Sequence, residues 1–524
     1  MFKNMLGKLC AFGHDKSGIV LYLVAFLLVP FITLLAVAVD IGQFLVMKDQ
    51  LSAAVDSAAL NIAANPSLTA AQAKAQAQAF VNANFLTQSQ ATLSSLTVTQ
   101  SPPTVNVTAS AVMNTSFMQI AGYKTLTATV NSQATVGQNY LELVLVLDNT
   151  GSMSQTAGST TKIQGLITAA TELTNTLFAS DPTGKYVKIG IVPFTAAVNV
   201  GTAYSAAAWM DTTGLGSLTT ENLSIPPNNG LLWLYSKGEL KNVSWSGCVR
   251  QRNEPYDVED VSPAAATPDT LFTPYFAPDE PDQGSFANNY LSDGSCYTGK
   301  SQTQEQADQK CVAKYQNGNA NTSNGIGPNI YCPVKQILRL TNSEQAVLNE
   351  INGMTPYGNT VIPSGLMWGW HLLSPNGPFG DGVAYSNTTT IKAIVLVTDG
   401  DNDVGGGTNS FNKSVYNAYG YGSGPHLNKL SVPHGVSLSQ PEYNLVEKTL
   451  QLCSNIKAVL DQNGNSRILI YTIGLGTSIS ATGLNLLQTC ASNPSTFFAN
   501  PTTDELITTF QNIAIGLNKL RLSQ

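Results

Sequence analysis

The sequence is poor in charged residues. Only 11% of its 524 residues are Asp, Glu, Lys or Arg, whereas typical soluble domains contain roughly 25%. The polar surface must therefore consist mainly of Asn, Gln, Ser and Thr, a composition common in secreted and cell-envelope proteins. The chain has no run of basic residues and a net charge of −7. Because phosphate binding needs a basic face, this composition argues against nucleic-acid binding.

The sequence also lacks the motifs of common enzyme classes. It contains no His-Glu-x-x-His, no Gly-x-Ser-x-Gly and no phosphate-binding glycine loop with a lysine. Histidine is scarce, with four residues in the whole chain, and metal centres that activate water usually recruit histidine. We therefore expect that the protein is not an enzyme.

One uninterrupted apolar run, Ile19–Val39, lies near the N-terminus and ends at Asp40. Its twenty-one residues, at ~1.5 Å each in a helix, span about 31 Å, the thickness of a bilayer core. Lys3, Lys8 and Lys16 precede the run. The positive-inside rule therefore predicts a single-pass protein with a cytoplasmic N-terminus and its bulk outside the membrane.

Two other interpretations of the run are a buried core helix and a cleaved signal peptide. A core helix rarely contains so long a stretch without a charge. Ala36-Val37-Ala38 resembles a signal-peptidase site, but signal peptides have apolar regions of about 7–15 residues. We therefore expect an uncleaved anchor. Pro30 lies in the middle of the run, where membrane helices tolerate proline.

Seven cysteines are present, and only Cys10 precedes the apolar run. An even number on the oxidising side of the membrane predicts three disulfides, and the absence of a Cys-x-x-Cys pair argues against a zinc site. The long gap after the fourth of these six cysteines suggests that the first four pair among themselves and that the last two form a pair. In chain order they are Cys248, Cys296, Cys311, Cys332, Cys453 and Cys490.

Hydrophobic periodicity divides the chain. Residues 1–17 are expected in the cytoplasm and 18–40 in the membrane. The pattern over residues 41–137 predicts a membrane-proximal unit. It begins with a helix that breaks at Asn65-Pro66-Ser67, and a second, alanine-rich helix follows. Half-buried strands, in which apolar and hydroxyl residues alternate, come after the helices.

Strands and helices alternate over residues 138–524, which predicts an α/β domain. Continuous β-branched strands with helices between them are typical of a doubly wound, mostly parallel sheet covered on both faces. The expected strands are 141–148, 186–194, 391–399, 467–476 and 496–500, and the expected helices are 162–179, 343–354, 364–373, 441–461, 482–490 and 503–520. Residues 203–340 lack periodicity and carry four cysteines, so we expect an inserted, disulfide-stapled subdomain.

Oxygen-bearing side chains follow two of these strands. The segment VLVLDNTGSM (144–153) ends in Asp148, Thr150 and Ser152, a second strand ends at Asp399, and Thr360 follows a glycine turn between them. Because ligands bind at the carboxyl ends of strands in open α/β sheets, we expect these side chains to meet. Such an oxygen set suits a hard cation, Mg²⁺ (or Mn²⁺ or Ca²⁺), whose coordination a partner's carboxylate could complete. Each residue alone could instead be a turn or helix cap.

The segments DNTGSM, GNT and VTDG resemble the three parts of the metal-ion-dependent adhesion site of von Willebrand factor type A domains. The resemblance implies that Thr150, Ser152 and Thr360 are hydroxyl ligands. It also implies that Asp148 and Asp399 ligate directly or through water.

A second resemblance concerns the whole chain. The N-terminal segment from Gly18 to Ala64, the stretch that begins GCVRQRNEPYDVED and the end NIAIGLNKLRLSQ resemble TadG-like Flp (Tad) pilus assembly proteins. This implies a role in the bacterial inner membrane, with a pilus or envelope component as the protein partner. Pseudopilins of the TadE type are processed after a glycine that is followed by a glutamate at the fifth position. Here Gly18 is followed by Leu23 at that position, so we expect the anchor to be retained.

These observations predict a membrane-anchored module that binds a divalent cation and docks an acidic group of its partner. A structural scaffold with a non-functional metal site is the alternative. A metal-dependent hydrolase is the least supported reading.

Overall fold

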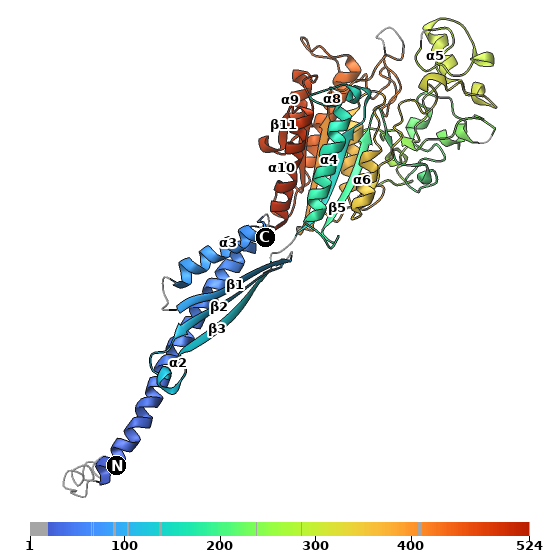
Figure 1. Ribbon diagram of the computed structural model, residues 1–524. Helices are drawn as coiled ribbons and strands as arrows, with labels where there is room; N and C mark the ends of the chain where they lie inside the picture. Colours follow the sequence, from blue (N-terminus) through green and yellow to red (C-terminus); the bar gives the residue numbers. More distant parts are fainter. Residues whose placement is uncertain are drawn as a thin grey trace. The chain divides into compact units, whose positions relative to one another are not determined.

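The computed structural model describes residues 19–63, 65, 68–86, 91–101, 104–135, 139–236, 238–284, 286–406 and 411–522. The chain divides between residues 138 and 139 into two compact units, the second being Asn139–Arg521 (Figure 1). Each unit is described by itself.

The first unit combines two helices with a three-stranded antiparallel sheet. The sheet has the order β1-β2-β3. Its elements are α2 (Ile19–Ala63), α3 (Ala70–Val81), the π-helix η1 (Asn82–Leu86), β1 (Ala91–Ser101), β2 (Thr104–Asn114), the 3-10 helix η2 (Met118–Ala121) and β3 (Thr125–Thr135). α2 ends before the predicted helix break and α3 begins after it, although Pro66 and Ser67 themselves lie outside the described residues; the predicted strands are confirmed.

Sequence periodicity explains how this unit packs. In β2, alternate residues are buried, as expected for a strand with one covered face: Val105, Val107, Ala109, Ala111 and Met113. The outer part of α2 contributes a stripe at helical spacing to the same core: Leu51, Val55, Ala58, Ala59 and Ile62. The sheet therefore has one face packed on the helices and one face of hydroxyl side chains.

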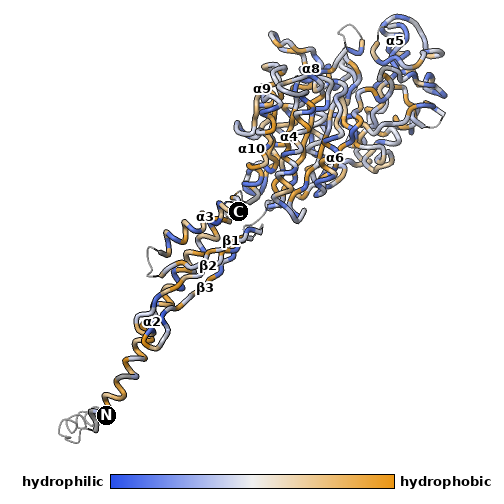
Figure 2. The backbone as a smooth tube through the Cα atoms, in the orientation of Figure 1, coloured by the Kyte–Doolittle hydropathy of each residue, from blue (hydrophilic) through white to orange (hydrophobic). Residues whose placement is uncertain are grey.

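The N-terminal part of α2 has no such cover. Its apolar side chains are exposed, with Phe26 at 80% and Leu34 at 69%, and this stretch is strongly hydrophobic (Figure 2). Pro30 lies inside the helix without interrupting it. By length and composition, α2 is the one helix in the described part of the chain that could cross a membrane.

The second unit is mixed α/β, as predicted. Its sheet has the order β11-β10-β9-β4-β5-β6-β7, and β8 pairs with β5. The five strands from β11 to β5 are parallel, and the remaining pairings are antiparallel. The strands are β4 (Tyr140–Asp148), β5 (Val187–Phe194), β6 (Val198–Asn199), β7 (Cys248–Val249), β8 (Leu338–Thr341), β9 (Thr390–Thr398), β10 (Ile468–Gly474) and β11 (Phe497–Ala499).

Helices pack on both faces of this sheet. Alternate residues of β4 enter two different cores: Val144 and Val146 contact one, and Leu143 and Leu145 contact the other. The first core includes residues of α7 (Ile362–Leu373), α8 (Gln440–Lys457) and α9 (Ala481–Cys490), and the second includes residues of α4 (Lys162–Ala179), α6 (Glu344–Asn352) and α10 (Thr503–Leu522). Burial on both faces explains the continuous apolar character of the central strands.

The predicted pairing of the cysteines is confirmed. Cys453 pairs with Cys490 and thereby joins α8 to α9. The four earlier cysteines pair among themselves, as Cys248–Cys332 and Cys296–Cys311.

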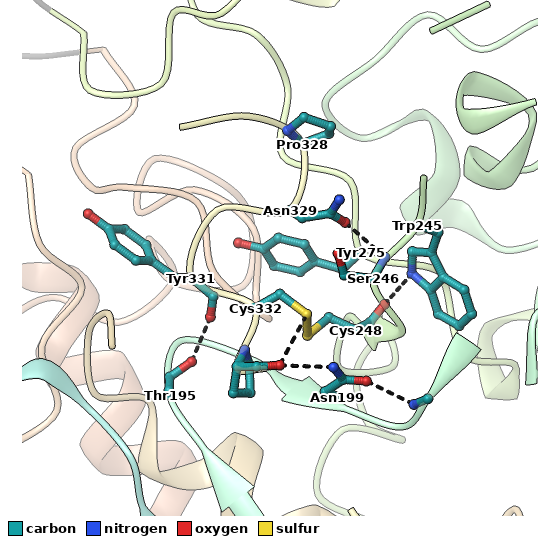
Figure 3. Close-up of a disulfide and its surroundings, with 12 residues drawn as sticks. Thr195, Asn199, Trp245, Ser246, Cys248, Tyr275, Pro328, Asn329, Tyr331 and Cys332 are labelled. Carbon is teal, nitrogen blue, oxygen red and sulfur yellow. Dashed lines mark hydrogen bonds between the residues drawn. A yellow bond between two sulfur atoms is a disulfide. The ribbon is translucent and has the colours of Figure 1, made fainter. Parts of the chain in front are cut away.

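Residues 203–340 contain short 3-10 helices and one α-helix, α5 (Gln302–Lys310), and they lie within the compact unit of the sheet. Around Cys248–Cys332, the indole nitrogen of Trp245 donates to the carbonyl of Cys248 (2.7 Å), and Thr195 Oγ1 donates to the carbonyl of Tyr331 (2.6 Å) (Figure 3). Since Thr195 follows β5 directly, this bond and the disulfide tie the segment to the sheet.

Candidate functional site

The site begins at the carboxyl end of β4. Asp148 is fully buried, and its carboxylate accepts hydrogen bonds from the backbone N–H of Thr150 (2.8 Å) and from Thr398 Oγ1 (2.6 Å). Thr398 is the last residue of β9, which pairs with β4 in parallel. The neighbouring strand ends are therefore joined through Asp148.

Thr150, Ser152 and Asp399 continue this network. The hydroxyls of Thr150 and Ser152 lie 3.1 Å apart, and Ser152 Oγ donates to Asp399 Oδ1 over 2.7 Å. Asp399 is fully buried. One hydrogen-bonded network thus contains four of the five side chains predicted as metal ligands.

Thr360 comes from a third loop that is bonded to the first. The N–H of Gly151 donates to the carbonyl of Gly358 (2.9 Å), and the N–H of Tyr357 donates to the carbonyl of Asn149 (2.7 Å). Thr360 follows these contacts and is buried. No hydrogen bond within the described residues joins its hydroxyl to the four other predicted ligands.

A glycine makes this loop geometry possible. Gly358 has φ +80°, and a Cβ at this position would lie 2.9 Å from the ring of Tyr331. The left-handed backbone and the close ring both favour a residue without a side chain. The glycine turn before Thr360 is therefore a requirement of the site's local geometry.

Lys162, which the sequence analysis did not assign to the site, also reaches it. Its ammonium group lies 2.6 Å from Asp399 Oδ2 and donates to Ser478 Oγ (2.9 Å) and Gln155 Oε1 (3.3 Å). Both charged side chains are buried, at 4% and 0% exposure. Lys162 is the first residue of α4. A positive charge at the N-terminal end of a helix is unfavourable because of the helix dipole. This unusual position is the one feature of the sequence that could have indicated a role for Lys162 in the site.

The charge of Asp399 acts on the buried carboxyl group of Asp148. Burial and the charge of Asp399 raise the pKa of Asp148 from its ordinary value of 3.8 to about 7. Lys162 directly neutralises the negative charge of Asp399 but makes no ion pair with Asp148. A cation placed among the hydroxyls would relieve the remaining repulsion.

The donor set fits a hard divalent ion. The expected ligands are the hydroxyls of Thr150, Ser152 and Thr360 together with Asp148, all of which offer oxygen. Both oxygens of Asp399 are already engaged, by Ser152 and Lys162. Asp399 would therefore act on an ion through Ser152 or through water. In the described part of the chain, no three His, Cys, Asp or Glu side chains gather as a metal cluster.

Further polar and titratable side chains of the second unit have structural contacts. Asp401 accepts hydrogen bonds from the backbone and hydroxyl of Ser480, which caps α9. Asp403 binds the amide of Asn359 at 2.8 Å. His371 is buried in the core, where it packs against Phe272 and Trp368.

The N-terminal resemblance is confirmed by comparison with protein families. Residues 18–64 match the family described as "Putative Flp pilus-assembly TadE/G-like". The match covers α2 and so concerns the apolar helix and its outward continuation. No curated protein matches the chain.

Solved structures with some similarity include several pilus proteins. The pilus adhesin SpaC from Lactobacillus rhamnosus GG has 11% identity and a TM-score of 0.34, over 83% of this chain and 35% of SpaC. The vWF domain of the type V pili tip protein Mfa5 from Porphyromonas gingivalis has 11% identity and a TM-score of 0.32, over 73% of this chain and 97% of the domain. The PilB minor pilin from Streptococcus sanguinis has 11% identity and a TM-score of 0.32, over 82% and 79%. Similarity this low carries no argument about function.

Proposed function

We propose that the chain is a TadG-like protein of Flp (Tad) pilus assembly, held in the bacterial inner membrane by α2 with its N-terminus in the cytoplasm. Its second unit, Asn139–Arg521, is a doubly wound von Willebrand factor type A domain. This domain binds a divalent cation, Mg²⁺ or in its place Mn²⁺ or Ca²⁺, and docks an acidic group of a pilus or envelope protein. The family match of residues 18–64 supports the pilus assignment.

The observation that carries the metal proposal is the convergence of buried oxygens at adjacent strand ends. Asp148 and Asp399 come from neighbouring strand ends. Ser152 donates to Asp399 and lies beside the hydroxyl of Thr150, and Thr398 donates to Asp148. Buried carboxylates are costly unless they are paired or coordinate a metal. Lys162 pairs with Asp399 but not with Asp148. Thr150, Ser152 and Thr360 would hold the ion, with Asp148 as the nearest negative charge.

The charges of the site favour an acidic partner. With both acids ionised, Asp148 and Asp399 contribute two negative charges and Lys162 contributes one positive charge. A bound divalent ion would leave the site with one positive charge in excess. A carboxylate from a partner would neutralise that charge and fill an open coordination position.

Calorimetric titration of Mg²⁺ and Mn²⁺ into the full chain in nanodiscs tests the proposal. Asp148→Asn preserves the size of the side chain but removes its charge, so we expect saturable binding by the wild type and none by this variant. Asp49→Ala is a matched control, because Asp49 is an exposed carboxylate on α2 in the other unit. Equal binding by the wild type and Asp148→Asn would refute the site.

Pilus formation in cells separates docking from a scaffold role. If the site docks a partner, Asp148→Asn should abolish pilus assembly while the protein remains folded and present in the membrane. Full assembly by this variant would favour the scaffold with a non-functional metal site.

A further inference from the structure

The loop between β2 and β3, residues 115–124, exposes three large apolar side chains. Phe117 is 45% exposed, Ile120 87% and Tyr123 63%. All three lie within a stretch of seven residues of this loop. Exposed apolar residues gathered in this way mark an interaction surface.

The loop is fixed to α2 at the residue where the apolar run ends. Asp40 is fully buried and accepts hydrogen bonds from the backbone N–H groups of Ser116 (2.9 Å), Phe117 (2.9 Å) and Met118 (2.6 Å). These bonds satisfy a carboxylate at the end of a run that otherwise carries no charge. They also hold the loop at one level along the helix.

The loop has a defined shape of its own. Thr115 Oγ1 donates to the carbonyl of Tyr123 (2.6 Å), and the N–H of Tyr123 donates to the carbonyl of Met118 (3.1 Å). Gly122 closes η2 with φ +94°. The exposed side chains therefore project from an ordered turn.

Burial along α2 shows the level that the loop reaches. One turn before Asp40, Ala36 and Val37 are half-buried, whereas Leu35 and Val39 beside them are exposed at 54% and 47%. η2 contacts α2 in this region, and Figure 1 shows the loop beside the helix. At ~1.5 Å per residue, Ala36 lies about 6 Å before Asp40, inside the expected membrane span.

We propose that loop 115–124 is a membrane-interface anchor, which places Phe117, Ile120 and Tyr123 in the outer interfacial layer of the bilayer that α2 crosses. Lipid is the favoured occupant because the surface is continuous with the apolar face of the span. Aromatic side chains such as Tyr123 are enriched at this level, and the adjacent exposed Lys124 can reach lipid phosphates. The inference rests on the proposed membrane span of α2. It goes beyond that proposal because it assigns the outer boundary of the span and gives the β2–β3 loop a lipid contact of its own.

Depth-dependent fluorescence quenching tests this anchor in the full chain. In a Cys10→Ser background, which leaves the six paired cysteines oxidised, a single cysteine at position 120 (Ile120→Cys) is labelled with NBD. The protein is placed in vesicles of phosphatidylethanolamine and phosphatidylglycerol containing lipids with a doxyl quencher either near the headgroup or near the chain end. Phe31→Cys in the span and Thr97→Cys on the exposed side of β1 are the matched controls.

The label at position 120 should lose more fluorescence to the shallow quencher than to the deep one. The label at position 31 should lose more to the deep quencher, and the label at position 97 should lose fluorescence to neither. Quenching at 31 without quenching at 120 would overturn the anchor but leave the span intact. Absence of quenching at 31 would overturn the span and the anchor together.

Discussion

Replacing Lys162 by methionine tests whether a cation and this lysine act on the same buried charge. The ammonium lies 2.6 Å from Asp399, and both side chains are almost completely buried. Methionine has a similar length but no charge, so Asp399 would lose its counter-charge without losing its burial. Removing one partner of a buried ion pair costs about 3–5 kcal/mol. We therefore expect the metal-free variant to be destabilised by this amount.

A divalent cation should restore part of that stability. Ser152 connects Asp399 to the candidate metal position, so the ion would supply the positive charge that the variant lacks. A tenfold tighter Kd in the variant corresponds to about 1.4 kcal/mol more stabilisation by saturating metal than in the wild type. We expect a difference of at least this size.

Tryptophan fluorescence provides the assay. All five tryptophans lie in the second unit, at positions 209, 233, 245, 368 and 370, so urea unfolding followed by their emission reports on this unit in the full chain. Melts with and without Mg²⁺ give the stabilisation by metal for each variant.

Lys392→Met is the matched control. Lys392 forms an equally buried pair with Glu142, 2.5 Å apart and with side chains 0% and 3% exposed, near the opposite end of β4 from Asp148. We expect this variant to be destabilised but to gain no more from Mg²⁺ than the wild type. If Lys162→Met also gained no more than the wild type, the reasoning that the lysine and the ion share the charge of Asp399 would be wrong.

Three further predictions concern the turn before Thr360, an acid-sensitive ion pair and a disulfide. Gly358→Ala should weaken metal binding at least tenfold in calorimetry, because the Cβ collides with Tyr331 in a left-handed turn; unchanged affinity would mean that Thr360 is not a ligand. Burial alone would raise the pKa of Glu221, but Arg250 and His426 outweigh it and lower the pKa to about 2. The carboxyl group therefore binds its proton less tightly in the folded state than in the unfolded state. The resulting stabilisation of the folded state is present above pH ~4.5 and is lost as the pH falls toward 2. Urea melts should accordingly lose less stability between pH 5 and 3 in Glu221→Gln, and equal slopes would contradict the assignment. Cys453→Ser with Cys490→Ser should cost about 4 kcal/mol in the same melts, because the bridge closes a loop between residues 37 apart; no loss would show that α8 and α9 hold together without it.

Periodicity predicted the regular elements well, because each long helix or strand buries a continuous face. The predicted helix 162–179 coincides with α4, and the strand ends that carry Asp148 and Asp399 do lie side by side. The two-residue strands β6 and β7 could not be predicted. Pairings so short leave no periodic pattern and depend on contacts distant in sequence.

The candidate site shows the same limit. Hydroxyl and acidic residues that directly follow buried strands can be recognised from the local sequence. Four of the predicted ligands could therefore be grouped before their positions were known. Lys162 meets Asp399 across 237 positions in the sequence. Its approach is decided by the packing of α4 against the sheet, which no local pattern encodes.

The continuity of α2 has a mechanical consequence. Its 45 residues form one helix from the apolar run to the core of the three-stranded sheet, a length of about 68 Å at ~1.5 Å per residue. Asp40 joins the β2–β3 loop to the middle of this helix, so the sheet is attached to it at more than one level. A tilt or rotation of the apolar part of α2 would therefore be passed directly to the three-stranded sheet through one continuous helix.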